Sequence, residues 1–350
     1  MSSSEPQPVR DEDAFDVRAV QAWLRTQRDD VPDGLPEVAQ YGGGASNLTY
    51  LLRWPDREWV LRRPPAGVKA ASAHDMVREH RVQSALAPHF PQVPAMVALC
   101  TDPAVLGADF YVMEKVPGTI LRRKLPEGLE LSREQAHALG TRAFDVLERL
   151  HAVDVEAAGL GDLGKGRGYV GRQVAGWSDR FRRARTENVP DCAAVMRWLD
   201  AHQPDDVGTV LVHNDFRLDN LVLDDDLDVV AVLDWEMATL GDPLMDLGGA
   251  MAYWVQADDD DLFRLSKRQP SDLPGMPTRD DIVRRYAERS GLSLSDWTFY
   301  EVFGLFRLAV IVQQIYYRFH HGQTTNPAFQ DFWAFVGVLE DRCRRVAGIA

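Results

Sequence analysis

One segment of the sequence has residue types and a spacing that suit phosphoryl transfer. His213, Asp215 and Asn220 follow the pattern H-x-D-x-x-x-x-N, and Asp234 follows an apolar run further on. An Asp can accept the proton of an attacking hydroxyl, whereas an Asn oxygen and a second carboxylate can hold Mg²⁺ against a nucleoside triphosphate. Asp215 is therefore the candidate base, and Asn220 and Asp234 are the candidate metal ligands.

The segment between Asn220 and Asp234 predicts a β-hairpin. Two short apolar runs, residues 221–223 and 229–233, flank an acidic turn, and this pattern is typical of two paired strands. A hairpin would return Asp234 to the neighbourhood of Asn220. Any single Asp or Asn is more often a turn residue or a helix cap, but the combination favours a functional site. We expect His213 to brace the loop without acting in catalysis.

The two segments resemble those of a known family. Residues 213–220 read His-Asn-Asp-Phe-Arg-Leu-Asp-Asn, and residues 233–248 read Leu-Asp-Trp-Glu-Met-Ala-Thr-Leu-Gly-Asp-Pro-Leu-Met-Asp-Leu-Gly. They resemble the aminoglycoside phosphotransferase and choline kinase-like family, and within it the branch that is fused ahead of acyl-CoA dehydrogenases in animals. The resemblance extends over nearly the whole chain. It implies an α+β, two-lobed protein-kinase-like fold with a small antiparallel-sheet N-lobe and a larger, mainly helical C-lobe.

The resemblance also implies a domain organisation. We expect a disordered lead at residues 1–14, a nucleotide-binding N-lobe at residues 15–116, and a C-lobe at residues 117–350 with the catalytic loop, the metal ligands and the substrate site. Arg217 is expected near the γ-phosphate, where a cation would neutralise charge that builds in the transition state. Asp246 is expected either to pin the catalytic loop or to cap its own helix.

The N-lobe half of the expected site begins with a glycine cluster at residues 42–44. Glycines let a backbone approach phosphate groups closely. The match to G-x-G-x-x-G is incomplete, because Asn47 stands where the third glycine would be, and a lone glycine cluster is most often a hairpin turn. The resemblance implies a loop that covers the nucleotide phosphates, formed by Gly43, Gly44, Ser46 and Asn47.

The nucleotide also requires a cation and an adenine contact. Arg62 stands where the kinase pattern has a Lys that pairs with phosphates. An Arg keeps the charge and can make bidentate contacts, so we expect the role to survive. Glu79 falls on a helical stretch and is expected to orient Arg62, with a surface helix charge as the alternative. Residues 109–118 resemble the hinge whose backbone holds adenine, with Glu114 and Val116 as the expected contacts.

Caps and spacing predict two helices. Residues 15–27 have helical spacing after a candidate cap at Asp13, and Ser132 opens a capping box at the start of a helix that runs to His151. A basic run at residues 180–185 leaves two interpretations open. It is either a solvated helix face or a positive patch that meets an anionic substrate.

Composition limits the classes of function. The 350 residues carry a formal net charge of −14, which argues against a nucleic-acid surface. The three cysteines lack metal-type spacing and fit a reduced cytoplasm without a disulfide framework. The longest apolar stretch, residues 303–317, includes Arg307 and predicts a core helix capped by Gly322, too short to span a membrane. We expect a cytoplasmic protein with neither a nucleic-acid nor a membrane partner.

These observations predict a kinase that uses ATP or another nucleoside triphosphate with Mg²⁺ and phosphorylates a hydroxyl of a small molecule. The resemblance to proteins fused with acyl-CoA dehydrogenases suggests a hydroxyacyl-CoA or a similar metabolite as acceptor. An aminoglycoside, another amino alcohol or a sugar is the alternative, and a catalytically silent nucleotide-binding protein is a rival. Acyl-CoA dehydrogenase activity is a further rival, although the sequence has no flavin-type organisation. Oligomeric state is left open.

Overall fold

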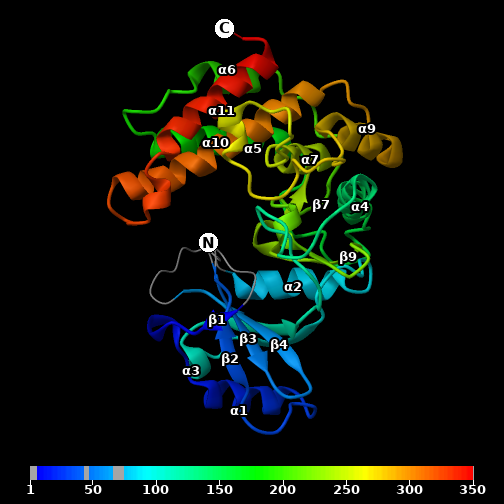
Figure 1. The fold of residues 1–350 in the computed structure, drawn as a ribbon, viewed down its shortest axis with the longest axis vertical. Coiled ribbons are helices and arrows are strands. Elements are labelled where there is room, and N and C mark those ends of the chain that lie inside the picture. Colours follow the sequence, from blue (N-terminus) through cyan, green and yellow to red (C-terminus); the bar gives the residue numbers. More distant parts are fainter. Residues whose placement is uncertain (1–5, 43–46, 66–74, 350) are drawn as a thin grey trace. The chain divides into compact units, whose positions relative to one another are not determined.

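The structure divides into two units, and each unit is formed by two separate stretches of the sequence. A computed structural model describes residues 6–42, 47–65 and 75–349. The first unit contains Met1–Ile120 and Leu221–Glu236, and the second contains Leu121–Asn220 and Met237–Ala350. The colours of Figure 1, which follow the sequence, show the first unit mainly in blue and cyan. The predicted hairpin therefore belongs to the first unit, although residues of the second unit precede and follow it in the sequence.

The first unit is built on an antiparallel sheet. In the part of the chain that the structure describes, this sheet has six strands in the order β1-β2-β3-β4-β6-β5. The strands are β1 (Gln7–Pro8), β2 (Glu37–Gln40), β3 (Leu48–Arg53), β4 (Glu58–Arg63), β5 (Met96–Cys100) and β6 (Phe110–Glu114). The register pairs Arg62 of β4 with Thr49 and with Tyr111. Arg62 therefore lies on an inner strand, and the predicted small antiparallel sheet is confirmed.

Two longer helices accompany this sheet, α1 (Val17–Gln27) and α2 (Met76–Leu86), together with the short α3 (Pro103–Leu106). The expected cap of α1 at Asp13 is wrong. Asp16 caps the helix, because its Oδ1 accepts the backbone N–H groups of Arg18 at 2.9 Å and Ala19 at 3.1 Å. Both Asp residues precede the helix, but only the one directly before the first helical residue can reach these groups.

Residues 7–13, predicted as part of a disordered lead, have regular structure, so that prediction is wrong for them. Strand β1 pairs with β2, and a 3₁₀ turn, η1, covers Asp11–Asp13. The backbone oxygen of Asp13 accepts hydrogen bonds from Tyr50 at 2.7 Å and from Arg63 at 2.7 Å. Polar contacts with the sheet hold this segment in place. Its composition, which is poor in apolar residues, gives no sign of these contacts.

The hairpin predicted between Asn220 and Asp234 is confirmed. Strands β8 (Leu221–Leu223) and β9 (Val229–Val232) pair antiparallel. Asp224 stabilises the turn, because its Oδ1 accepts two backbone N–H groups of the acidic segment at 3.0 and 2.9 Å. The register sets the first residue of β8 opposite the last residue of β9. Asn220 therefore precedes, and Asp234 follows, the same open end of the hairpin.

The second unit is mainly helical, as predicted. Its helices are α4 (Arg133–His151), α5 (Tyr169–Ala184), α6 (Ala193–Ala201), α7 (Pro243–Met251), α8 (Asp261–Arg264), α9 (Arg279–Ser290), α10 (Trp297–His320) and α11 (Phe332–Ala347). Strand β7 (Val210–Val212) pairs antiparallel with β10 (Thr239–Gly241). The capping box at Ser132 and the helix end at His151 are confirmed.

Helix α10 is longer than the apolar stretch that predicted it. It covers 24 residues, and Gly322 ends it with a φ of +68°. Gly322 donates its N–H to Phe319 O at 3.0 Å, and the next N–H bonds to Arg318 O at 2.8 Å, which is the hydrogen-bond pattern of a Schellman cap. Among the described residues, α10 alone is long and apolar enough to cross a membrane, and 72% of its most apolar window is buried inside the protein.

Close packing of α7 against α10 depends on two glycines. A Cβ atom added at Gly304 of α10 would collide with the backbone of Gly248, and one added at Gly248 would lie 2.5 Å from the backbone oxygen of Tyr300. The helices therefore touch backbone to backbone, with no room for side chains at these two positions. Because Asp246 lies on α7, this contact fixes the helix that supports the loop between β7 and β8.

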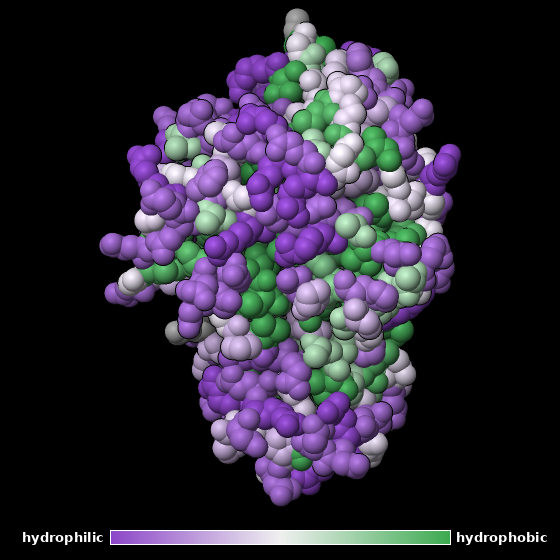
Figure 2. Space-filling model, turned by 90° about the vertical axis from the view of Figure 1, so that its right-hand side faces the viewer, coloured by the Kyte–Doolittle hydropathy of each residue, from purple (hydrophilic) through white to green (hydrophobic). Residues whose placement is uncertain are grey.

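Most apolar side chains are buried within the units. In the first unit, aromatic residues such as Tyr50, Trp59 and Phe110 form one core, and all three are fully buried. Figure 2 shows that hydrophilic side chains cover much of one face of the molecule, with smaller apolar patches between them. This distribution agrees with a sequence in which 26% of the residues are charged.

Candidate active site

The loop between β7 and β8 brings three predicted site residues together. The Oδ2 atom of Asp215 lies 3.1 Å from Arg217 Nη2 and 3.1 Å from Asn220 Nδ2. Asn220 Nδ2 also donates to the backbone oxygen of Asp215 at 2.8 Å. The carboxylate is thus held by a cation and an amide within one short loop, as a base that must meet a substrate in a fixed orientation requires.

The orientation of Asn220 suits a metal ligand. Its amide nitrogen is committed to Asp215, so its amide oxygen is the atom that remains for a cation. A neutral oxygen of this kind is a ligand that Mg²⁺ accepts. The structure therefore fits the predicted role of Asn220 chemically.

Arg217 contacts two acids of its own loop. Besides Asp215, its Nε lies 3.3 Å from Asp219 Oδ1, and its guanidinium carbon is 4.7 Å from the ring centroid of Tyr253. Burial raises the pKa of Asp219, and Arg217 opposes that shift. Arg217 thus has an ion-pairing role that the sequence did not predict, in addition to its expected place near a phosphate.

Asp246 anchors the catalytic loop from α7. Its carboxylate accepts the backbone N–H groups of His213 at 2.6 Å and Asn214 at 2.8 Å, and lies 3.1 Å from His151 Nε2. Burial opposes the charge, but these partners prevail and lower the pKa of Asp246. Asp242 caps α7 instead. Of the two roles expected for Asp246, the structure therefore supports the loop anchor.

His213 supports the loop as predicted. Its side chain is fully buried, and its Nδ1 accepts the backbone N–H of Asp215 at 3.2 Å. His151, at which the sequence predicted the end of a helix, contacts Asp246 through one ring nitrogen and the hydroxyl of Tyr286 at 2.6 Å through the other. A buried polar network thus extends from the catalytic loop to α4 and α9.

Sequence reasoning missed Asn214, which precedes the candidate base. Its φ is +65°, a left-handed conformation that Asn tolerates better than most residues. Its Oδ1 accepts from Tyr169 at 3.1 Å, its backbone oxygen accepts from Arg307 at 2.6 Å, and its Nδ2 donates to Met237 O at 3.1 Å. Burial raises the pKa of Tyr169 to about 12, which keeps its hydroxyl a donor. These contacts fix the backbone that carries Asp215.

The first unit holds a second cluster, centred on Arg62. Its Nη2 lies 3.1 Å from Asp234 Oδ1, and its Nη1 lies 3.6 Å from Glu79 Oε2. Arg62 is 9% exposed and Glu79 is 2% exposed, so the alternative of a surface helix charge for Glu79 is excluded. Asp234 has a φ of +69°, and such strained backbone is found mainly at functional sites.

Glu79 connects Arg62 to Asn47. Tyr111 donates its hydroxyl to Glu79 Oε2 at 2.8 Å, and Asn47 Nδ2 donates to Glu79 Oε1 at 3.1 Å. Burial raises the pKa of Glu79; Arg62 and Tyr111 oppose the shift, and Asp234 adds to it. The three other predicted loop residues, Gly43, Gly44 and Ser46, lie outside the described residues.

The expected hinge follows β6. Glu114 ends this strand, and its backbone N–H donates to Ala95 O at 2.8 Å. That group is therefore used in a backbone contact beside the sheet. Val116 lies two residues beyond the strand and is partly buried.

The candidate metal ligands are few. Within residues 6–42, 47–65 and 75–349, no group of three or more His, Cys, Asp or Glu side chains is arranged to hold a metal ion. Mg²⁺ in phosphoryl-transfer enzymes is usually held by one or two protein carboxylates together with substrate phosphates. The amide oxygen of Asn220 and the carboxylate of Asp234 are, as chemical groups, ligands that Mg²⁺ accepts.

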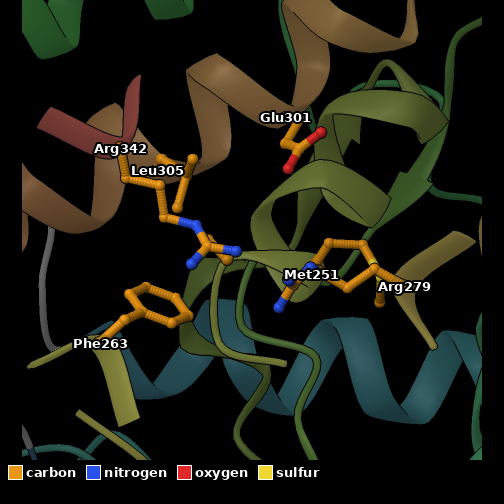
Figure 3. Close-up of a pocket in the computed structure, with 7 residues that line it drawn as sticks. Met251, Phe263, Arg279, Glu301, Leu305 and Arg342 are labelled. Atoms are coloured by element: carbon orange, nitrogen blue, oxygen red, sulfur yellow. The ribbon is translucent and has the colours of Figure 1, made fainter. Parts of the chain in front are cut away.

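A small pocket in the second unit contains none of these residues. It is lined by Met251, Ala252, Phe263, Arg279, Glu301, Leu305 and Arg342 (Figure 3). Arg279 and Arg342 both pair with Asp259, at 2.7 and 2.8 Å, and the guanidinium of Arg342 lies 4.1 Å from the Phe263 ring centroid. The space admits about one water molecule, so this pocket is too small for a substrate.

The fold of the units and the Asp215 loop define a phosphotransferase of the protein-kinase-like class. The profile described as "Phosphotransferase enzyme family" matches residues 37–282. The chain belongs to this family.

Relatives with curated names are longer proteins. Acyl-CoA dehydrogenase family member 10 of Mus musculus is 37% identical over 326 residues, covering 92% of this chain and 30% of that protein. Acyl-CoA dehydrogenase family member 11 of Homo sapiens is 31% identical over 335 residues, covering 93% of this chain and 42% of that protein. The chain thus spans less than half the length of these relatives, as the predicted relation to a fused domain implies.

Solved structures support the fold. A Ralstonia eutropha protein, provisionally described as an aminoglycoside phosphotransferase, is 33% identical with a TM-score of 0.81, covering 96% of this chain and 99% of that one. Choline kinase from Cryptosporidium parvum is 11% identical with a TM-score of 0.65, covering 95% of each chain. A thermostable aminoglycoside phosphotransferase mutant, in a ternary complex with AMP-PNP and hygromycin B, is 17% identical with a TM-score of 0.58, covering 94% and 98%. The last two similarities concern the fold alone.

Proposed function

We propose that the protein is an ATP- and Mg²⁺-dependent kinase that phosphorylates a hydroxyl of a small molecule. The observation that carries this proposal is the Asp215 carboxylate, which Asn220 and Arg217 hold on a loop anchored by Asp246. Family membership supports the reaction class, and the contacts of the loop support the individual roles.

Asp215 acts as the base in this proposal. The acceptor oxygen forms a bond to the γ-phosphorus, the bond from that phosphorus to the bridging oxygen breaks, and ADP leaves. Asp215 takes the hydroxyl proton during this step. Its ion pair with Arg217 holds the carboxylate in place, and Arg217 also balances charge on the transferring phosphoryl group.

The first unit binds the nucleotide in this proposal. Arg62, oriented by Glu79, contacts the phosphates, and a loop that covers them is formed by Gly43, Gly44, Ser46 and Asn47. Glu114 and Val116 contribute backbone contacts to the base. When bound, Mg²⁺ neutralises phosphate charge, and Asn220 and Asp234 are the residues that hold it. Because Arg62 contacts Asp234 directly, a phosphate on Arg62 and a cation on Asp234 would replace one ion pair with two favourable contacts.

The acceptor we propose is a hydroxyacyl-CoA or a similar hydroxylated metabolite. The names of the relatives that match most of this chain support it, since they belong to acyl-CoA dehydrogenase family members. An aminoglycoside or another amino alcohol is the alternative, supported by the kanamycin and hygromycin B complexes of structures with the same fold. A catalytically silent nucleotide-binding protein is less well supported, because Asp215, Asn220 and Asp234 are all present. We further propose a cytoplasmic location.

Release of ADP tests this proposal with purified protein, ATP and Mg²⁺. Wild-type protein is supplied in turn with a hydroxyacyl-CoA, a free hydroxy acid, kanamycin and choline. We expect Asp215→Asn to lower turnover by roughly 10²- to 10⁴-fold, the usual contribution of a general base, and to leave ATP affinity nearly unchanged. Asp225→Asn is the matched control, because Asp225 is an exposed residue of the hairpin turn.

Two results would overturn the assignment. Near-normal turnover of Asp215→Asn would remove Asp215 from the role of base. Tight ATP binding without transfer to any acceptor or to water would favour the silent nucleotide-binding alternative.

A further inference from the structure

Two arginine side chains lie against one tryptophan ring in the second unit. The ring centroid of Trp177, on α5, is 4.7 Å from the guanidinium carbon of Arg180 and 5.2 Å from that of Arg307, on α10. Trp177 is 6% exposed, and its Nε1 donates to Gln173 Oε1 at 3.0 Å. The ring is therefore fixed, and its π-face attracts both cations.

This cluster has no acidic counterpart among the described residues. Arg307 is 6% exposed, and its hydrogen bond is to the backbone oxygen of Asn214. No carboxylate in the described ranges forms an ion pair with Arg180 or Arg307. Arg182, on the same helix, does pair with Asp179, at 2.9 Å. Arg180 is exposed, whereas Arg307 is buried. Because buried charges are normally paired, a buried Arg307 whose neighbouring charge is a second cation is unusual in a chain with a net charge of −14.

Two neighbouring arginines repel the charge of Arg180. Partial burial, followed by the charges of Arg183 and Arg307, lowers the pKa of Arg180. A bound anion would relieve both repulsions and would supply the missing counter-charge. The two interpretations of the basic run at residues 180–185 therefore apply to different residues. Arg182 is part of a solvated, ion-paired helix face, whereas Arg180 belongs to a cluster that lacks an anion.

We propose that Arg180 and Arg307, held on Trp177, bind a negatively charged group of the phosphate acceptor. This proposal rests on the proposed kinase function and narrows its substrate to an anionic hydroxyl compound, with a phosphate or a carboxylate as the group recognised. Arg307 also bonds to the residue directly before Asp215, so the anion site and the candidate base share one support. Cationic acceptors such as aminoglycosides do not match this site.

Arg180→Gln tests the proposal, because Arg180 does not contact the catalytic loop through any hydrogen bond of the described residues. The acceptors are 3-hydroxybutyryl-CoA, free 3-hydroxybutyrate and kanamycin. We expect the KM for the anionic acceptor to rise about 10- to 100-fold, the range of a charge-assisted hydrogen bond, while kcat and the KM for ATP change less than twofold. Arg182→Gln is the matched control on the same helix, and Arg180→Lys should restore part of the affinity.

Direct binding separates this site from catalysis. Calorimetric titration without ATP uses coenzyme A and 3-hydroxybutyrate as probes. If Arg180→Gln weakens the binding of coenzyme A but not of 3-hydroxybutyrate, phosphate is the recognised group. If it weakens the binding of 3-hydroxybutyrate but not of coenzyme A, carboxylate is the recognised group. Either result supports the anion site. If the wild-type protein binds these probes but transfers no phosphate, only the kinase proposal fails.

Three results would overturn the anion site. One is phosphate transfer by wild-type protein with an unchanged KM for the anionic acceptor in Arg180→Gln. Another is efficient use of kanamycin with no use of either anionic compound. The third is an absence of binding of both anionic probes to wild-type protein together with no dependence of acceptor KM on Arg180. In the first two cases the proposed kinase function would stand.

Discussion

The two units surround their buried carboxylates in different ways. In the second unit, Asp246 accepts two backbone N–H groups of the catalytic loop and contacts His151, and its pKa is lowered. In the first unit, Glu79 lies beside Arg62, but burial and the nearby Asp234 raise its pKa. For Asp246, the contacts with His151 and the loop outweigh burial, whereas for Glu79 burial and the nearby Asp234 outweigh the donors Arg62 and Tyr111.

This difference suits the parts that the two clusters have in the proposed reaction. The loop that carries Asp215 must stay fixed, and Asp246 ties it to α7 through hydrogen bonds that no substrate replaces. Arg62 instead pairs with both Glu79 and Asp234, and Asp234 is 34% exposed at its side chain. We therefore expect the Arg62 pairs to exchange on nucleotide binding while the Asp246 contacts persist.

Removal of Asp246 should have the largest effect on stability. Asp246→Ala leaves two backbone N–H groups of the catalytic loop, and the Nε2 atom of His151, without their hydrogen-bond partner. We expect the free energy of unfolding to fall by about 3–5 kcal/mol, measured by urea denaturation with circular dichroism. Asp179→Ala is the control, because its exposed pair with Arg182 contributes at most about 1 kcal/mol.

If Asp246→Ala does not fold, Asp246→Asn still reports on the anchor. The amide oxygen can accept one of the loop N–H groups, so the loss should be smaller than for Ala. A change below that of Asp179→Ala in either folded variant would show that the loop does not depend on Asp246.

The pH dependence of stability should have opposite signs in the two units. The pKa of Asp246 is lowered in the folded protein, so its contribution is present above its ordinary value of 3.8 and is lost as the pH falls further. The pKa of Glu79 is raised, so its contribution is present below 4.5 and is lost as the pH rises through the folded value.

Paired variants measure these signs. The free energy of unfolding of wild-type protein minus that of Asp246→Asn should shrink as the pH falls below 3.8. The free energy of unfolding of wild-type protein minus that of Glu79→Gln should decrease as the pH rises above 4.5. The same direction of change in both pairs would contradict the contrast between the two carboxylates.

The sequence predicted the parts of the site whose residues are close along the chain. Asp215 and Asn220 share one loop, and the alternation of apolar runs with an acidic turn predicted the hairpin before Asp234. Local rules of capping also placed Ser132 correctly. Such features depend on spacing, which a single sequence records.

The partners of the loop could not be predicted in this way. Tyr169 and Arg307 both contact Asn214, but they lie on two helices far apart in the sequence. Asp246 was expected as a loop anchor, but only from the family resemblance and with a helix cap as the alternative. The side chains of Tyr169 and Arg307 carry no motif, because each makes one hydrogen bond to the loop, and the geometry of that bond depends on how the helices pack. The ordered segment at residues 7–13 was missed for the same reason, since its contacts are with distant parts of the sheet.

The central claim of the proposed mechanism is that Asn220 and Asp234 hold the same Mg²⁺ ion. Binding of manganese tests this claim most directly. Mn²⁺, a paramagnetic substitute for Mg²⁺, is titrated into ATP-loaded protein, and free Mn²⁺ is followed by electron paramagnetic resonance. Wild type, Asn220→Leu, Asp234→Asn and the double variant form a cycle. We predict that each single variant weakens Mn²⁺ binding about tenfold or more and that the two effects are not independent. Wild-type affinity in either single variant would contradict the claim.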